Sequence, residues 1–332
     1  MPAKTIDVTG IGNAIVDVIS RADDSFLAEN GIEKGAMNLV DADRSSQIYG
    51  RMGPGIEMSG GSAANTIVGL ASFGGKGAFI GKVRDDPFGQ VFRHDITAAG
   101  VRFETSHSVS GPPTASCLVL VTPDAQRSMN THLGACVDLG PEDVDEDLIK
   151  ASKVVYLEGY LWDPPRAKEA FLKAAAIAHA SDGLVSLTLS DSFCVDRHRA
   201  EFRDLVERHV DILFANEAEI ISLYEAPDFD TALQAVRGHC RTVALTRSAR
   251  GSVVLSGDEV HILDAEKPVR VVDTTGAGDL YAAGFLYGFT QSMDPVRCGR
   301  LGGIAAAEVI SHFGARPEAD LNALAKATLD RH

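Results

Sequence analysis

The segment VVDTTGAGDLYAAGFLYG, residues 271–288, sets glycines against an aspartate directly after an apolar run. We interpret it as a strand that ends at Val272 and a helix that begins near Gly278. The first amides of a helix have no internal partner and lie at the positive end of its dipole. Because Gly276 and Gly278 lack side chains and Ala277 is small, an anion can approach these amides closely. The segment therefore predicts a cradle for a transferring phosphoryl group.

Asp279 stands where its negative charge would repel a bound phosphate. The conflict disappears if this carboxylate serves the other reactant, because an alcohol that attacks phosphorus must lose its proton to a base. The segment then suits a kinase with Asp279 as its catalytic base. A second interpretation stays open from the residues alone, since an aspartate in the first turn also stabilises a helix without any catalytic role.

The composition excludes several classes of function. The 332 residues carry a formal net charge of −15, with 45% hydrophobic and 23% charged residues. This charge argues against nucleic-acid partners and anionic membranes, although a local group of amides can still hold a small anion. Five scattered cysteines form no C-x-x-C pair, so we expect neither disulfides nor structural zinc and predict a cytoplasmic protein. The N-terminus lacks the apolar core of a signal peptide, and no apolar run reaches the ~20 residues that span a bilayer.

Strand-like and helix-like segments alternate from about residue 152 onward. The strand-like runs are 154–159, 184–190, 210–216 and 242–248. Helical spacing follows at 166–180, 202–209, 217–224 and about 231–240. This rhythm predicts parallel βαβ units, and the near-continuous apolar strands indicate a sheet covered on both faces. We therefore expect a doubly wound α/β fold.

The N-terminal half predicts additional β structure. TASCLVLVTPDAQRSMNTHLG (114–134) is typical of a hairpin with TPDAQ at its turn. Helical spacing with glycine stops marks two further segments, 62–74 and 86–100. No linker or repeat separates folding units, so we expect one domain, 1–332. Within it we expect a small β lid made from two segments, about 14–45 and 104–133.

Two glycine-rich stretches carry a family resemblance. DTTGAGDLYAAGF and SGGSAANTIVGLASFGGKGAFIGKVRDDPFG (59–89) resemble, in this order, the two signatures of the ribokinase/PfkB family of carbohydrate and nucleoside kinases. The likeness covers nearly the whole chain. It implies a ribokinase-like α/β fold with a β-sheet lid, and MgATP-dependent phosphorylation of a hydroxymethyl group.

Three further stretches, GIGNAIVDVI, LTLSDSF and HVDILFANEAEI, are similar to the adenosine-kinase branch of this family. LSDSFCVDR stands where sugar kinases more often carry D-x-N-x-R, which favours a nucleoside over a free sugar. The resemblance thus implies transfer to the 5′-hydroxyl of a purine nucleoside, with Asp279 removing the proton and amides around Gly276, Ala277 and Gly278 holding the phosphoryl group. Two alternatives stay open: a kinase for ribose, fructose or a related sugar, and a catalytically silent nucleotide-binding regulator.

The resemblance also implies residues that bind the acceptor. Asp17 matches the carboxylate that accepts hydrogen bonds from two sugar hydroxyls, although on its own it could equally be an exposed strand carboxylate. Other matching positions are Asn13, Gly61, Ser62 and Asn65. Positions expected to pack on the base or sugar are Met37, Leu39, Met129, Leu133 and Tyr160. Apolar residues and tyrosines of this kind are also common in ordinary cores.

On the nucleotide side, Arg127 matches an arginine that reaches the phosphates when the lid closes, with a solvated hairpin charge as the alternative. Asn216 and Glu219 form N-x-x-E, implied to organise Mg²⁺ through water, although the same pair could be a helix capping box. The remaining positions matched to ATP are Thr246, Ser248 (where the family often has glycine), Gly251, Thr275, Gly303 and Ala306. A requirement for K⁺ and the choice between monomer and homodimer stay open.

Overall fold

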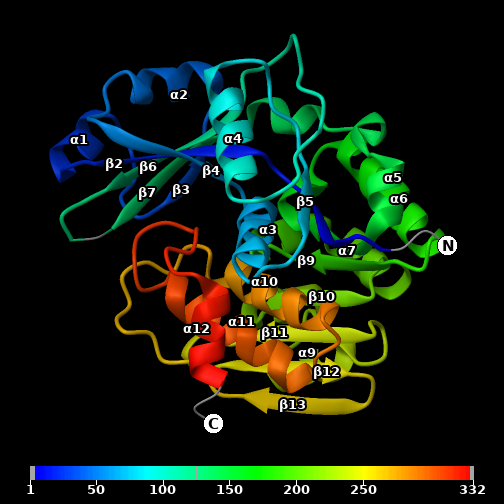
Figure 1. Ribbon diagram of the computed structural model, residues 1–332. Helices are drawn as coiled ribbons and strands as arrows, with labels where there is room; N and C mark the ends of the chain where they lie inside the picture. Colours follow the sequence, from blue (N-terminus) through cyan, green and yellow to red (C-terminus); the bar gives the residue numbers. More distant parts are fainter. Residues whose placement is uncertain (1–3, 125, 330–332) are drawn as a thin grey trace.

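The computed structural model describes residues 4–124 and 126–329 and contains two β-sheets (Figure 1). The larger sheet has eight strands in the order β13-β12-β11-β10-β9-β8-β1-β5. Their bounds are β1 (Ile6–Ile11), β5 (Gly77–Ile80), β8 (Ser152–Glu158), β9 (Leu184–Thr188), β10 (Ile212–Asn216), β11 (Thr242–Thr246), β12 (Ser252–Ser256) and β13 (Glu259–Leu263). The strands from β5 to β11 in this order are parallel, and β12 and β13 extend the sheet antiparallel at one edge.

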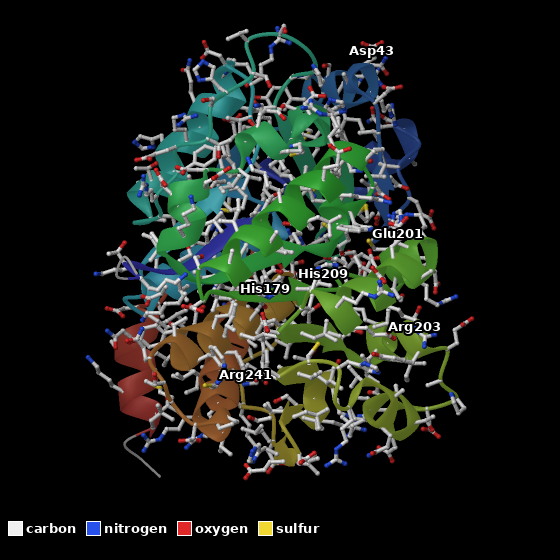
Figure 2. The ribbon with its side chains drawn as sticks, turned by 90° about the vertical axis from the view of Figure 1, so that its right-hand side faces the viewer. Asp43, His179, Glu201, Arg203, His209 and Arg241 are labelled. Carbon is white, nitrogen blue, oxygen red and sulfur yellow. The ribbon has the colours of Figure 1, made fainter. Side chains whose placement is uncertain are left out.

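Helices cover both faces of the larger sheet (Figure 1). On one face lie α3 (Ser62–Ser72), α10 (Ala277–Thr290) and α11 (Pro295–Val309), with α12 (Leu321–Leu329) packed on α3 and α11. On the other lie α5 (Glu146–Ala151), α6 (Pro165–Ala180), α7 (Ser192–Arg208), α8 (Glu217–Tyr224) and α9 (Phe229–Val236). Figure 2 shows this second face from the side, where the labelled Glu201, Arg203 and Arg241 are exposed. The apolar strand residues are thus buried between two helical layers, as their composition predicts.

The smaller sheet has five strands in the order β3-β7-β6-β2-β4. Their bounds are β2 (Ile15–Arg21), β3 (Met37–Leu39), β4 (Gly55–Gly60), β6 (Ala115–Val121) and β7 (Arg127–His132). It takes strands from both segments expected for the lid and, in addition, β4, which lies between them in the sequence. β6 and β7 pair antiparallel, and the expected turn between them contains residue 125, which lies outside the described residues. That this sheet closes over a ligand stays a prediction.

One face of the smaller sheet is covered and the other is open. Val16, Val18 and Leu118 belong to the core that α1 (Asp24–Glu29), α2 (Ala42–Tyr49) and α4 (Pro87–Ala98) complete. β2 alternates between partly exposed and buried residues, so Asp17 lies on the opposite face. The short 3₁₀ helices are η1 (Gly134–Asp138), η2 (Pro141–Asp143), η3 (Gly159–Trp162) and η4 (Ser248–Arg250).

The predicted α/β fold is confirmed, but the strand expected to end at Val272 is wrong. Residues 264–276 form no strand, and Val271 is exposed. The Val272 amide donates to the carbonyl of Ile310, the C-cap of α11, at 2.8 Å. A strand needs a neighbouring strand for its amides, and this segment meets a helix end instead. α10 begins at Ala277, one residue before the predicted start.

The carboxyl ends of the parallel strands lie on one edge of the larger sheet, where open α/β sheets bind ligands. Glu158 ends β8, Asn216 ends β10 and Thr246 ends β11. No helix in the described ranges 4–124 and 126–329 is long and apolar enough to cross a membrane.

Candidate active site

α10 begins without a side-chain cap. Its N-cap residue, Gly276, has φ +76° and carries no side chain that could accept from the first turn. Within residues 4–124 and 126–329, no hydrogen bond uses the amides of Gly276, Gly278 or Asp279. A Cβ placed at Gly278 would meet no atom within 4 Å, so the helix start faces open space. An anion there would meet several unpaired donors at the positive end of a 14-residue helix.

Asp279 is held by two side chains from α3. Ser62 donates to Oδ1 at 2.6 Å and Asn65 Nδ2 donates to Oδ2 at 3.0 Å. Thr66 adds a hydrogen bond to the Asp279 carbonyl at 3.1 Å. Burial raises the pKa of the Asp279 carboxyl, while the Ser62 and Asn65 hydrogen bonds and the charge of Arg316 lower it. The carboxylate is therefore oriented by neighbours that stabilise its charged form.

The turn between β4 and α3 is shaped by glycines. Gly61 has φ +97°, and a Cβ on it would lie 2.1 Å from the carbonyl oxygen of Asn13. A Cβ on Gly60 would lie 2.3 Å from Asp17 Oδ2. Only glycine at these two positions lets the turn approach both β2 and the loop before it. Close packing of the turn thus brings Asp17 next to α3.

Glu158 is a buried carboxylate behind this turn. Its Oε1 accepts from the Asn13 side chain at 2.7 Å and from the Asn13 amide at 3.3 Å, and its Oε2 accepts from the Ala63 amide at 2.8 Å. Burial raises the pKa of Glu158 to about 7, against the effect of these hydrogen bonds, which lower it. Asn13 is accordingly turned toward Glu158, and the pair ties the end of β8 to the start of α3.

Arg316 holds the opposite side of the same turn. Its guanidinium donates to the Ser59 carbonyl at 2.8 and 3.0 Å, to Ser59 Oγ at 3.0 Å and to the Ala64 carbonyl at 2.9 Å. Ser59 in turn donates to Asp95 Oδ2 from its amide and hydroxyl, at 2.7 and 2.6 Å. Burial lowers the pKa of Arg316 to about 10, so it stays charged near neutral pH.

Asp17 extends from the open face of the smaller sheet. Burial raises its pKa to about 6; the charges of Arg316 and Arg127 lower it, and that of Asp279 raises it further. Asp17, on β2 of the smaller sheet, therefore lies within electrostatic range of Asp279, which is on α10 of the layer that covers the larger sheet. Ile19 lies two residues after Asp17 on β2 and on the same face of the sheet. It belongs to an apolar row that crosses the sheet, made of Ile56, Ile19, Val119, Met129 and Met37.

Arg127, at the start of β7, forms an ion pair with Asp273. Asp273 also accepts from the Thr275 amide at 3.0 Å through Oδ1 and from the Gly314 amide at 3.0 Å through Oδ2. The Arg127 Nε atom is buried without a partner in the described part of the chain. The smaller sheet is thus joined to the loop before α10. That Arg127 reaches a phosphate stays a prediction.

Asn216 and Glu219 form the capping box that was the alternative interpretation of N-x-x-E. Asn216 Oδ1 accepts from the Glu219 amide at 2.9 Å, and Glu219 accepts from the Asn216 amide at 2.9 Å and from its side chain at 2.6 Å. Burial raises the pKa of Glu219 to about 7. In the described residues, no group of three or more His, Cys, Asp or Glu could hold a metal ion.

Comparison with known proteins identifies the family. The model of the pfkB family of carbohydrate kinases matches residues 56–321, most of the chain. The chain belongs to the pfkB family. The pfkB fold is also found in two similar solved structures. Adenosine kinase from Sinorhizobium meliloti is 55% identical with a TM-score of 0.91, covering 98% of this chain and 100% of that chain. A probable sugar kinase from Rhizobium etli is 53% identical with a TM-score of 0.91, covering 98% and 99%.

Among curated pfkB relatives, the ATP-dependent ribose-1-phosphate kinase of Halopiger xanaduensis is 31% identical over 88% of this chain and 93% of its own length. The predicted family and fold are therefore confirmed. As a pfkB member, the chain is a phosphotransferase that acts on an alcohol group of a sugar or nucleoside. The names of these relatives include both kinds of acceptor.

The other positions predicted from the pfkB resemblance are distributed over both sheets, their loops and α11. Tyr160 follows β8 and donates from its hydroxyl to the Ser190 carbonyl at 3.2 Å. Ser248 has φ +53°, the left-handed conformation that glycine adopts most readily, at the position where the family often has glycine. The rest are positioned as follows: Leu39 on β3, Leu133 before η1, Thr246 at the end of β11, Gly251 after η4, Thr275 before α10, and Gly303 and Ala306 on α11. Their contacts with ligands stay predictions.

Glu158 and Arg316 belong to this site although neither was predicted from the sequence. Glu158 ends an apolar strand, and a polar residue at the carboxyl end of a parallel strand is the signal that could have marked it. Arg316 stands in an irregular loop after α11, between Ala315 and Pro317. Neither periodicity nor a motif distinguishes such an arginine from a solvated loop charge.

Proposed function

We propose that this kinase transfers the γ-phosphoryl group of ATP to the 5′-hydroxyl of a purine nucleoside, with adenosine as the preferred acceptor. One observation carries the proposal: Asp17 extends from the same face of the smaller sheet as the apolar row, within charge range of Asp279. A carboxylate suits a vicinal diol, and an apolar surface beside it suits a flat base. A nucleoside offers both groups, whereas a free sugar offers only hydroxyls.

In this mechanism Asp279 accepts the proton of the attacking hydroxyl as the oxygen–phosphorus bond forms and the bond to the ADP leaving group breaks. Ser62 and Asn65 hold the carboxylate for this step. Asn65 Oδ1 is buried without a partner in the described part of the chain and could accept from an acceptor hydroxyl. The free amides at the start of α10 would hold the transferring phosphoryl group.

Magnesium fits this site as part of MgATP. Both Glu219 carboxylate oxygens already accept from Asn216, so the pair suits contact through water better than direct coordination. When bound, the ion would neutralise charge on the phosphates.

The arginines near Asp17 argue against a phosphorylated acceptor. Arg316 donates to Ser59 and Ala64, and Arg127, whose Nε has no partner in the described residues, is paired with Asp273 and predicted to serve the phosphates of ATP, so no further arginine near Asp17 is left for the acceptor. Recognition of a phosphate on the acceptor needs a cation with free donors. Ribose 1-phosphate is for this reason expected to be a poorer acceptor than adenosine.

An acceptor screen tests the proposal. Purified protein with labelled ATP and Mg²⁺ would be offered adenosine, inosine, ribose, fructose and ribose 1-phosphate. We expect the highest kcat/KM with adenosine and AMP as its product. Turnover of the sugars or the sugar phosphate without turnover of nucleosides would reject the nucleoside assignment and favour a sugar kinase. Absence of turnover with every acceptor would favour a silent nucleotide-binding regulator.

A further inference from the structure

The partly buried guanidinium of Arg316 lies where the acceptor side and the catalytic side of the site meet. It comes from the loop after α11, yet its hydrogen bonds go to the last residues of β4 and the first turn of α3. The Ser59 and Ala64 carbonyls that it joins lie at the two ends of the turn that contains Gly60 and Gly61. One planar cation therefore spans the turn as a clamp.

This turn positions the groups around the proposed base. Ser62 and Asn65, whose side chains hold Asp279, follow directly from it on α3. Gly60, inside the turn, packs against the carboxylate of Asp17. A change in the turn would therefore displace the neighbours of Asp17 and of Asp279 together.

The charge of Arg316 acts on both carboxylates as well. It is the larger of the two cationic effects that lower the pKa of Asp17, ahead of Arg127. It also lowers the pKa of Asp279, against the effect of burial. Asp95, on α4, is the acid whose charge acts most strongly on Arg316 in return, and it accepts from Ser59, so the positive charge is balanced from behind the turn.

Several other titratable groups lie close enough to Asp279 to interact with its charge and contribute to the pH dependence of the site. Those whose ionisation its charge affects are Asp17 on β2, Tyr156 and Glu158 on β8, Tyr160 on η3 and Glu219 on α8. All of these groups are neutral or anionic. In the described part of the chain, Arg316 is the cation whose charge lowers the pKa of Asp279.

We propose that Arg316 is a positioning residue for phosphoryl transfer, which clamps the turn between β4 and α3 and supplies the positive charge beside Asp17 and Asp279. This inference rests on the proposed role of Asp279 as the base, but not on the identity of the acceptor. A purely structural arginine would only stabilise the turn. Arg316 would in addition set the pH range in which the site works.

The test compares three substitutions that separate charge from hydrogen bonding. Arg316→Lys keeps the charge and loses the planar fork, Arg316→Gln keeps donors without charge, and Arg316→Met removes both. Arg297→Gln, at an exposed arginine of α11, is the matched control. Thermal unfolding reports on folding, and kcat and kcat/KM are measured from pH 5 to 9 with the acceptor that the screen identifies.

We expect Arg316→Gln and Arg316→Met to move the acid limb of both pH profiles upward by roughly one unit, because removing a nearby cation raises a carboxyl pKa. Arg316→Lys should keep the wild-type limb and lose activity several-fold at all pH values. Arg297→Gln should change neither quantity. If one variant fails to fold, the other two still separate charge from geometry.

Equal losses at every pH, with the acid limb unmoved in the Gln and Met variants, would overturn the proposal and leave Arg316 a structural residue. A limb that moved in Arg316→Lys as far as in Arg316→Gln would also overturn it, because charge would then not be the cause. The base assignment is judged separately, by Asp279→Asn with Arg316 intact. Full activity of that variant would remove the basis of the proposed mechanism whatever the Arg316 variants do.

Discussion

The helices α8 and α10 both begin near the ligand-binding edge of the larger sheet, but their first turns differ. α8 satisfies its own start, because Asn216 and Glu219 exchange hydrogen bonds between side chains and amides. α10 has Gly276 as its N-cap and no side-chain cap; the Ala277 amide donates to the Thr274 carbonyl, and the Gly278 and Asp279 amides have no partner among the described residues. Natural helices rarely leave such donors without a partner. The comparison leads to the prediction that the start of α10 receives an external anion, whereas the first turn of α8 already satisfies its own donors.

The largest expected effect comes from Asp279→Asn, which removes the acid beside the open helix start. We expect kcat to fall by ~10²–10⁴, the range for loss of a general base, with little change in unfolding temperature. Steady-state kinetics and nucleoside binding by calorimetry check this. Asp294→Asn is the matched control, because Asp294 caps the start of α11 and should be dispensable for turnover. Near-normal turnover by Asp279→Asn would make Asp279 an ordinary first-turn carboxylate.

Alanine substitutions of the two glycines at the start of α10 should have different effects: one should impair turnover, and the other should impair stability. Gly278→Ala adds a methyl group where no atom lies within 4 Å, so it should stabilise the helix slightly while intruding on the anion position. We expect a loss of kcat of roughly 10²-fold, typical of a misplaced reacting group. Gly276→Ala should instead destabilise the protein, because φ is +76° and the new Cβ would lie 2.7 Å from Ala315 Cβ. Unchanged kinetics in Gly278→Ala would show that no anion approaches these amides.

The two carboxylates near the start of α10, Asp17 and Asp279, should make the activity depend on pH. Asp17 and Asp279 act as carboxylates in the proposed mechanism, and burial raises the pKa of both, that of Asp17 to about 6. Because protonation of Asp17 removes its active form, kcat/KM should fall by about tenfold for each unit well below pH 6, and more steeply where Asp279 is protonated as well. A profile from pH 4.5 to 8, with stability followed in parallel, checks the sign. A rate that rises as the pH falls would contradict the need for ionised carboxylates.

The smallest effect is expected at α8, where Asn216→Ala breaks the capping box. Loss of a cap costs about 1 kcal/mol, so the unfolding temperature should drop by a few degrees. Asp228→Ala, which removes the cap of the neighbouring α9, should give a similar loss of stability and serves as the control. We expect kcat to change less than tenfold in both variants. A much larger loss in Asn216→Ala alone, relieved by high Mg²⁺, would show that the box also organises the nucleotide.

The sequence predicts those parts of the molecule that are periodic or that match a motif. The strands and helices between residues 152 and 246 follow from apolar runs alternating with helical spacing, and the start of α10 follows from its glycines. β4 was not predicted and the segment before α10 was wrongly predicted as a strand, because pairing partners decide whether a short stretch becomes a strand. Glu158 and Arg316 escaped because a buried charge is recognised by what surrounds it, and their partners are far away in the chain.

The ion pair between Arg127 and Asp273 links the smaller sheet to the loop before α10, and each residue compensates the charge of the other. If a nucleotide phosphate draws Arg127 away from Asp273, this buried carboxylate keeps the amides of Thr275 and Gly314 as its partners in the described part of the chain. Depriving a buried carboxylate of its cation is costly, so phosphate and Asp273 compete for one guanidinium. In that case the position of the sheet sets the affinity for nucleotide, and by thermodynamic reciprocity the nucleotide sets the position of the sheet.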